Sequence, residues 1–141
     1  KNIEAFLDLD MPGTKLVVGG GPQLSALQQK YPDVVFTGPK FGEDLAAHYA
    51  SGDIFVFPSL TDTFGLVMLE AMASGLPVAA FPVTGPLDVL DGAKAGFMRE
   101  NLSEATELAF AACAKDARKH AEKFSWEACA EQFLDNLVHT Q

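Results

Sequence analysis

The sequence has few basic residues and no long apolar run. Of its 141 residues, 10 are lysine or arginine and 19 are aspartate or glutamate, which gives a formal net charge of −9. A nucleic-acid partner needs a basic face to neutralise phosphates, so this charge balance argues against one. No apolar stretch approaches the ~20 residues that a membrane-spanning helix needs. We expect a cytoplasmic protein without a signal peptide.

Cysteine is equally scarce. Cys113 and Cys129 lie far apart in a segment of helical spacing, and we interpret them as two reduced thiols rather than as a disulfide or a metal pair. The three histidines, His48, His120 and His139, show no ligand spacing and no neighbouring nucleophile. We therefore assign them to packing or to the surface and expect no metal site.

Short apolar runs alternate with segments of helical spacing. The runs lie at 15–18, 34–37, 54–57 and 78–81, with an edge strand expected at 96–98. This alternation predicts an α/β fold in which helices cover both faces of one doubly wound, Rossmann-like parallel sheet. Ligands of such sheets bind where the strands end at their carboxyl side. The loops at that side are 19–22, 38–41 and 59–65.

Residues 101–141 follow the predicted sheet as a charged helical tail. We expect two helices there, joined near Phe124 and Ser125, with Ser125 as the N-cap of the second. Phe124, Trp126 and Phe133 form an apolar stripe, which is typical of core or interface packing.

The segment from Asp53 to Pro86 is the most informative part of the chain. An apolar run stops at a proline, a polar loop follows, and Gly65 stands where the next helix begins. Unpaired N–H groups and the helix dipole make such a helix start favourable for anions. Asp62 and Glu70 flank this turn. Two such acids are often only a turn residue and a solvated helix residue, but Glu70 is the one charge in an otherwise apolar helix and asks for a partner.

A second loop, Gly19-Gly20-Gly21-Pro22, resembles a phosphate-binding loop. It does not match the dinucleotide fingerprint, because Leu24 occupies the position of the third glycine. The sequence therefore does not predict NAD binding.

Three stretches carry a resemblance to a known family. They are Thr-Asp-Thr-Phe-Gly, Glu-Ala-Met-Ala-Ser-Gly-Leu-Pro-Val and Val-Thr-Gly-Pro-Leu-Asp-Val, all between Thr61 and Val89. They resemble the donor-binding half of GT-B glycosyltransferases of the large retaining family 4, and look most like its bacterial mannosyl- and glucosyltransferases. In that family an acidic residue, seven others and a glutamate occupy this loop and helix. The first acid is Asp62 here, where the wider family usually has glutamate.

The resemblance implies a role for each matching residue. Asp62 is expected to face the sugar or the reacting centre and Glu70 to accept hydrogen bonds from ribose hydroxyls, so both are assigned as catalytic residues. The residues expected to bind the donor are Lys1, Gly20, Gly21, Thr63, Phe64, Gly65, Leu66, Val67 and Glu70. Lys40 is a second candidate for the base side of the nucleotide.

The same resemblance implies a retaining transfer of a hexose from a nucleoside diphosphate sugar to a lipid or saccharide acceptor. No metal or other cofactor is expected, and the resemblance implies that the product is a cell-envelope glycan or glycolipid. Two alternatives stay open, a non-catalytic nucleotide-sugar-binding module and a GT-B epimerase-like relative.

In this family a strand and a whole acceptor domain precede the region that we recognise. We therefore expect residues 1–141 to be a donor-binding domain that lacks the first strand and the N-terminal acceptor domain. A gap should separate the strands at 15–18 and 54–57, and an open sheet edge favours low stability or self-association. The longer protein is also expected to associate peripherally with a membrane, at its inner face.

Overall fold

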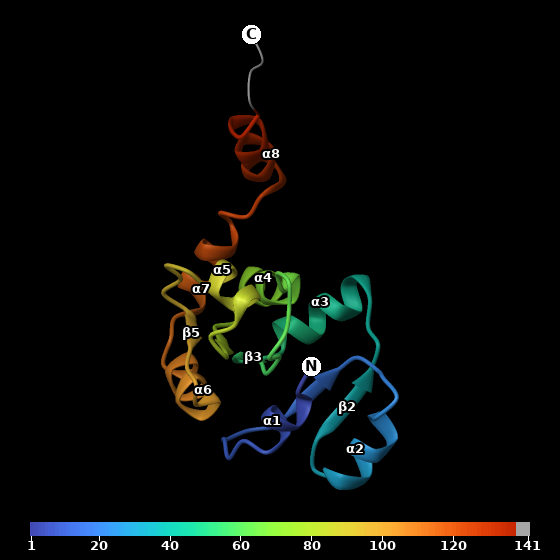
Figure 1. Ribbon diagram of the computed structural model, residues 1–141. Helices are drawn as coiled ribbons and strands as arrows, with labels where there is room; N and C mark the ends of the chain where they lie inside the picture. Colours follow the sequence, from blue (N-terminus) through green and yellow to red (C-terminus); the bar gives the residue numbers. More distant parts are fainter. Residues whose placement is uncertain (138–141) are drawn as a thin grey trace.

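The computed structural model describes residues 1–137, which form eight helices and five strands (Figure 1). The helices are α1 (Ile3–Leu7), α2 (Leu24–Lys30), α3 (Gly42–Ala50), α4 (Leu66–Ala73), α5 (Thr84–Val89), α6 (Leu102–Phe110), α7 (Ala114–Ala121) and α8 (Trp126–Asp135). The strands are β1 (Leu16–Val18), β2 (Val35–Gly38), β3 (Phe55–Phe57), β4 (Val78–Ala80) and β5 (Gly96–Met98). Each predicted strand is present within one or two residues of its expected limits.

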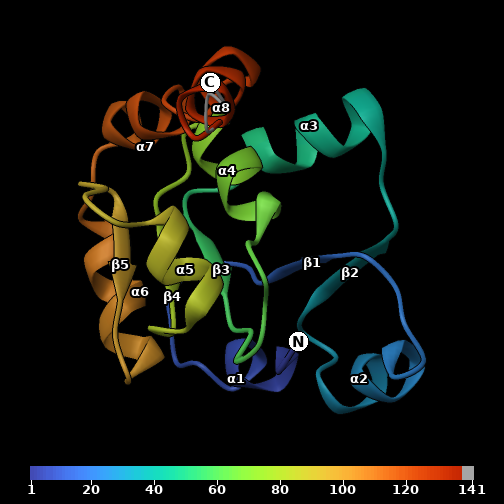
Figure 2. The same ribbon diagram turned by 45° about the horizontal axis from the view of Figure 1, so that its top comes forward.

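The strands form two parallel sheets, and the prediction of a single sheet is wrong. β1 pairs with β2, and β3, β4 and β5 form the second sheet in that order. All three pairings are parallel, as predicted, with β5 at an edge. Figure 2 shows the β1–β2 pair on one side of the molecule and the three-stranded sheet on the other. The split falls between β1 and β3, where the gap was expected, because no strand of the described residues hydrogen-bonds between them.

Helices cover both faces of the three-stranded sheet. Val78 and Ala80 face a core that includes Met68 and Met72 of α4, whereas Ala79 faces Ala105 of α6. All three residues of β4 are fully buried, as expected of the central strand in a doubly covered parallel sheet. The apolar run at 78–80 therefore reflects burial on both sides.

The β1–β2 side of the molecule is much less buried. None of the residues from 8 to 56 is buried, and α2 and α3 contribute no buried side chain. The stability of this part must depend on partly exposed contacts, which bury less apolar surface per residue. Low stability or self-association of the chain stays a prediction.

The tail contains three helices within the described residues, and the prediction of two is wrong. Ala109 at the end of α6 packs against one face of the three-stranded sheet, and Ala117 of α7 packs in the core on the other face. The chain must turn between them, although no glycine or proline marks the turn. Ser125 caps α8 as predicted, by accepting a hydrogen bond from the Ala128 amide at 3.1 Å. The expected helix end at Val138 and His139 lie outside the described residues.

Helix α8 projects away from the rest of the molecule (Figure 1). It has no buried residue, and Trp126 is 88% exposed. Of the predicted apolar stripe, Trp126 and Phe133 lie on α8 and are exposed, whereas Phe124 precedes the helix and is only 40% exposed. Cys113 and Cys129 are free and exposed. No helix within residues 1–137 is long and apolar enough to cross a membrane.

Candidate functional site

The candidate site is built on the loop between β3 and α4. Gly65 is the N-cap of α4 and has a left-handed backbone, with φ at 85°. A Cβ at this position would lie 2.5 Å from Cε of Met68, so glycine suits both the conformation and the space. No side chain caps α4, and Leu66 and Val67 of its first turn are exposed. The first N–H groups of the helix are therefore available to an anion.

Asp62 lies in this loop beside the first residue of the chain. Its Oδ2 accepts a hydrogen bond from Nζ of Lys1 at 2.7 Å, and its Oδ1 accepts one from the Phe64 amide at 3.3 Å. The lysine and the backbone amide hold the pKa of the Asp62 carboxyl below its ordinary value. The structure thus brings together two residues that lie 61 positions apart and that the sequence assigned to one site.

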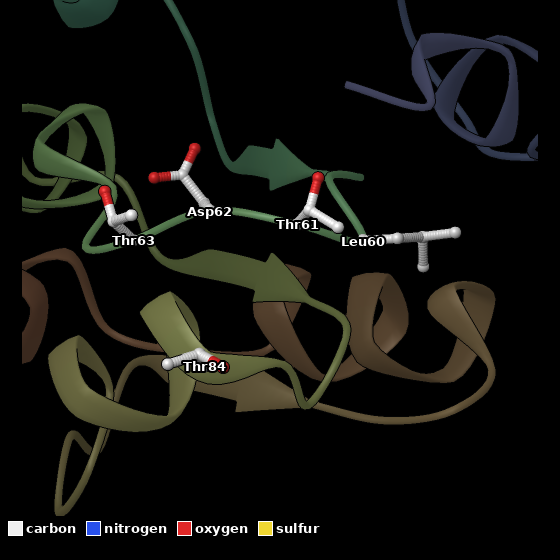
Figure 3. A pocket seen from close by; sticks show the side chains of 5 residues that line it. All are labelled: Leu60, Thr61, Asp62, Thr63 and Thr84. Atoms are coloured by element: carbon white, nitrogen blue, oxygen red, sulfur yellow. The ribbon is translucent and has the colours of Figure 1, made fainter.

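An open hollow of about 440 Å³ lies along this loop and is lined by Leu60, Thr61, Asp62, Thr63 and Thr84. Four of these residues follow one another along the loop, and Thr84 comes from the start of α5 (Figure 3). The lining offers three hydroxyl groups beside one carboxylate, which suits a polar ligand that both donates and accepts hydrogen bonds.

Thr84 and Gly85 were not singled out by the sequence analysis, although both lie in one of the stretches that carry the family resemblance. Gly85 is buried, and a Cβ on it would lie 2.9 Å from the Phe64 carbonyl oxygen and 3.3 Å from that of Asp62. Because these atoms belong to the backbone, they cannot give way as a flexible side chain can. Gly85 thus lets the start of α5 support the loop directly.

Glu70 lies on the exposed side of α4. The whole helix was expected to be buried, but only one side of it is. Its partner is Tyr49 of α3, whose hydroxyl donates a hydrogen bond to Oε2 at 3.0 Å. Partial burial and the Glu70 carboxylate raise the pKa of Tyr49 far above its ordinary value, so the phenol stays a donor. Glu70 therefore has the hydrogen-bonding partner that we expected. The sequence alone did not identify Tyr49 as that partner.

The other predicted residues lie at the ends of β1 and β2. A Cβ on Gly20 would lie 3.5 Å from the Pro39 side chain, so the loop after β1 adjoins the loop after β2. Lys40 forms an ion pair with Asp44 at 3.1 Å. Nothing in these contacts joins Gly20, Gly21 or Lys40 to Asp62.

No group of three or more His, Cys, Asp and Glu side chains among residues 1–137 is placed to hold a metal ion. The Asp-x-Asp sequence at Asp8 and Asp10 lies directly after α1, and Asp8 accepts a hydrogen bond from the Tyr31 hydroxyl.

Comparison with known proteins identifies relatives of this chain. GDP-mannose-dependent alpha-mannosyltransferase of Corynebacterium glutamicum is 34% identical over 139 residues, an alignment that covers 87% of this chain and 32% of that protein. D-inositol 3-phosphate glycosyltransferase of Mycolicibacterium smegmatis is 32% identical, with 88% of this chain and 33% of that protein covered. The chain thus spans about a third of the length of these curated relatives.

Solved GT-B glycosyltransferases share the fold. Sucrose-phosphate synthase from Thermosynechococcus elongatus superposes with a TM-score of 0.73 and 28% identity, over 94% of this chain and 39% of that one. Anabaena HepE in complex with UDP-glucose gives a TM-score of 0.70 at 22% identity, over 95% of this chain and 43% of that one. The family model for glycosyl transferases group 1 matches residues 3–115. With most of its length matched, this chain belongs to the glycosyl transferases group 1 family.

Proposed function

We propose that this chain forms the nucleotide-sugar-binding part of a retaining hexosyltransferase that acts without a metal. The observation that carries the proposal is the Lys1–Asp62 pair, which lies beside the uncapped start of α4. A cation and free N–H groups suit a diphosphate, and a carboxylate beside them suits a sugar hydroxyl. The chemistry of a nucleoside diphosphate sugar matches both.

Each residue then has a distinct task. Lys1 and the N–H groups at the start of α4 stabilise the negative charge that develops on the departing diphosphate. Lys1 is free to do so because its pair with Asp62 is exposed, with 75% of the lysine side chain accessible, and exposed pairs cost little to separate. Asp62, released from Lys1, accepts hydrogen bonds from the sugar.

The relatives support a donor of this class but differ in its base. The names of the mannosyltransferases specify GDP-mannose, whereas HepE was solved with UDP-glucose. The acceptor that we propose is a lipid or a saccharide, bound by an N-terminal domain outside this chain. We place the whole enzyme in the cytoplasm, peripherally at the inner face of a membrane, in the synthesis of cell-envelope glycans or glycolipids.

Calorimetric titration of the chain with GDP, UDP, GDP-mannose and UDP-glucose tests the proposal. We expect either GDP and GDP-mannose or UDP and UDP-glucose to bind. The affinity should be equal in magnesium and in EDTA, because Lys1 and the N–H groups at the start of α4 take the place of a metal cation. Absence of binding by all four compounds contradicts the proposal. Strict dependence on magnesium contradicts its metal-independent form.

A second prediction concerns Gly85. We expect Gly85→Ala to weaken binding of the preferred nucleotide sugar by about tenfold, because the added methyl group displaces the backbone at Asp62 and Phe64. Gly96→Ala is the matched control, since its Cβ would also be crowded, at 3.0 Å from Leu90, but at an edge of the sheet and away from the loop.

Both variants are expected to lower the melting temperature, and only Gly85→Ala should change the affinity measured at a temperature where each is fully folded. Equal affinity of the two variants would show that the start of α5 does not set the loop.

The epimerase-like alternative receives no support from the described histidines. That chemistry needs a histidine in the cleft, whereas His48 contacts Asp44 and His120 is buried against α5. A binding module without turnover differs from our proposal in its catalysis alone, so sugar transfer by a protein that carries this chain with its proposed acceptor domain separates the two.

A further inference from the structure

The loop of the candidate site contacts the junction between α7 and α8. The ring of Phe64, next to Asp62 and Thr63, meets the ring of Phe124 edge-on, with the ring centroids 6.4 Å apart. Phe124 lies directly before Ser125, the N-cap of α8. Aromatic pairs in this arrangement contribute beyond the area that they bury.

Phe124 also packs against a buried histidine. The ring of His120 lies 5.5 Å from that of Phe124 and is 4% exposed. Its Nε2 donates a hydrogen bond to the Val89 carbonyl oxygen at 2.8 Å, which fixes the plane of the imidazole. Its Nδ1 has no hydrogen-bond partner among the described residues, so this edge of the ring is held by packing alone.

These contacts connect the loop to α5 by two routes. Val89 is the last residue of α5, and the start of the same helix lies against the Phe64 backbone through Gly85. The loop is therefore supported twice, at its main chain by Gly85 and at its side chain by Phe124. His120 connects the two supports, because it bonds to α5 and packs on Phe124.

We propose that Phe124 is a positioning residue, which holds the 62–65 loop in the geometry that receives the sugar of the donor. The inference rests on the proposed function for the identity of the ligand, but not for the contact itself. It also connects the start of α8 to the site, because a movement of this helix displaces Phe124. From the sequence, Phe124 was expected only to form part of an apolar stripe.

The experiment compares Phe124→Ala, Phe124→Tyr and Phe110→Ala in the full chain. Phe110 is the matched control, since it is 40% exposed like Phe124 but ends α6, away from the loop. The first measurement is the backbone amide chemical shift of Thr63, Phe64 and Gly65 without ligand, after subtraction of the ring-current contribution of the Phe124 side chain. The second is the affinity ratio between each nucleotide sugar and its nucleoside diphosphate, for UDP-glucose with UDP and GDP-mannose with GDP.

We expect Phe124→Ala to shift the loop amides and to reduce the affinity added by the sugar about three- to tenfold, the size of an aromatic pair contribution. Phe124→Tyr should restore both, and Phe110→Ala should change neither. A role in stability alone lowers the melting temperature but does not move native amide signals or the ratio.

Unchanged loop amides in Phe124→Ala overturn the inference, whether or not nucleotides bind. A changed loop with an unchanged affinity ratio also overturns it. If the unmodified chain binds none of the four nucleotides while Phe124→Ala still shifts the loop amide signals, the proposed function fails. The contact by which Phe124 positions the loop then stands without it.

Discussion

Asp62→Ala is expected to abolish most sugar transfer while leaving nucleoside diphosphate binding intact. The carboxylate is proposed to contact the sugar and not the nucleoside, so its loss removes stabilisation at the reacting centre. Groups of this kind typically contribute a factor of about 10² to 10³ in turnover. Removal of Asp62 also frees Lys1, whose Nζ now lies 2.7 Å from Oδ2, for the diphosphate. Binding of GDP or UDP should therefore be unchanged or slightly tighter.

The measurement combines steady-state kinetics of a protein that carries this chain with its proposed acceptor domain and calorimetry with the nucleoside diphosphates. Asp62→Asn is the control for shape, because it keeps an acceptor oxygen for the Phe64 amide but loses the charge and replaces the oxygen that Lys1 contacts with an amide donor. We expect its turnover to lie between those of the parent and the alanine variant. If Asp62→Ala loses nucleoside diphosphate binding as well, the division of roles between the two acids is wrong. If the unmodified protein shows no turnover, the binding-module interpretation is favoured. If turnover is present and Asp62→Ala leaves it unchanged, Asp62 does not act on the sugar.

The depressed pKa of Asp62 sets a pH expectation for the same experiment. Lys1 and the Phe64 amide favour the charged carboxylate, so Asp62 stays ionised over the range of about pH 5 to 8. Its stabilising pair with Lys1 is present above the ordinary pKa of the acid and is lost only as pH falls through the lower folded value. A loss of activity between pH 7 and 6 should therefore persist in Asp62→Asn, because another group causes it.

The strand positions were predictable from the sequence because each strand of the three-stranded sheet is a short apolar run bounded by turn residues. Val78 to Ala80 is buried on both faces, and this produces a run without alternation. The separation into two sheets was predictable only as a gap, since hydrogen bonding between distant strands leaves no local signal. The break between Ala109 and Ala117 was missed for a related reason, because packing on opposite faces of the sheet forces a turn where propensity favours continuous helix.

The residues of the site also divide into those that a local sequence pattern identifies and those that only the fold brings together. Asp62 and Gly65 were identifiable from a loop that precedes a helix, where the residue types themselves carry the chemistry. Gly85 and Phe124 support that loop through contacts across more than 20 positions, which no local pattern reports. Tyr49 was missed likewise, because its hydroxyl meets Glu70 only after the fold has brought the end of α3 near α4.

Glu70→Ala is expected to weaken binding of both the nucleoside diphosphate and the nucleotide sugar by about 10- to 100-fold. The carboxylate is proposed to accept two hydrogen bonds from ribose hydroxyls, and leaving such groups unpaired costs about 1–3 kcal/mol. Oε2 is already oriented by the Tyr49 hydroxyl at 3.0 Å, so ribose meets a carboxylate whose position is fixed before binding. Because ribose is common to both ligands, the two affinities should fall by the same factor, in contrast to the effect of Asp62→Ala.

Tyr49→Phe separates the carboxylate itself from its orientation. This variant keeps the ring, which packs 6.0 Å from that of Phe55, and removes only the hydroxyl. We expect an affinity loss of about threefold or less, because Glu70 stays charged and merely becomes more mobile. Melting curves supply the stability control, and Glu70→Ala should change the melting temperature little, since the side chain is exposed. If Glu70→Ala leaves binding and turnover unchanged, the nucleoside must bind elsewhere, and the loops after β1 and β2, with Gly20, Gly21 and Lys40, are then the place to search.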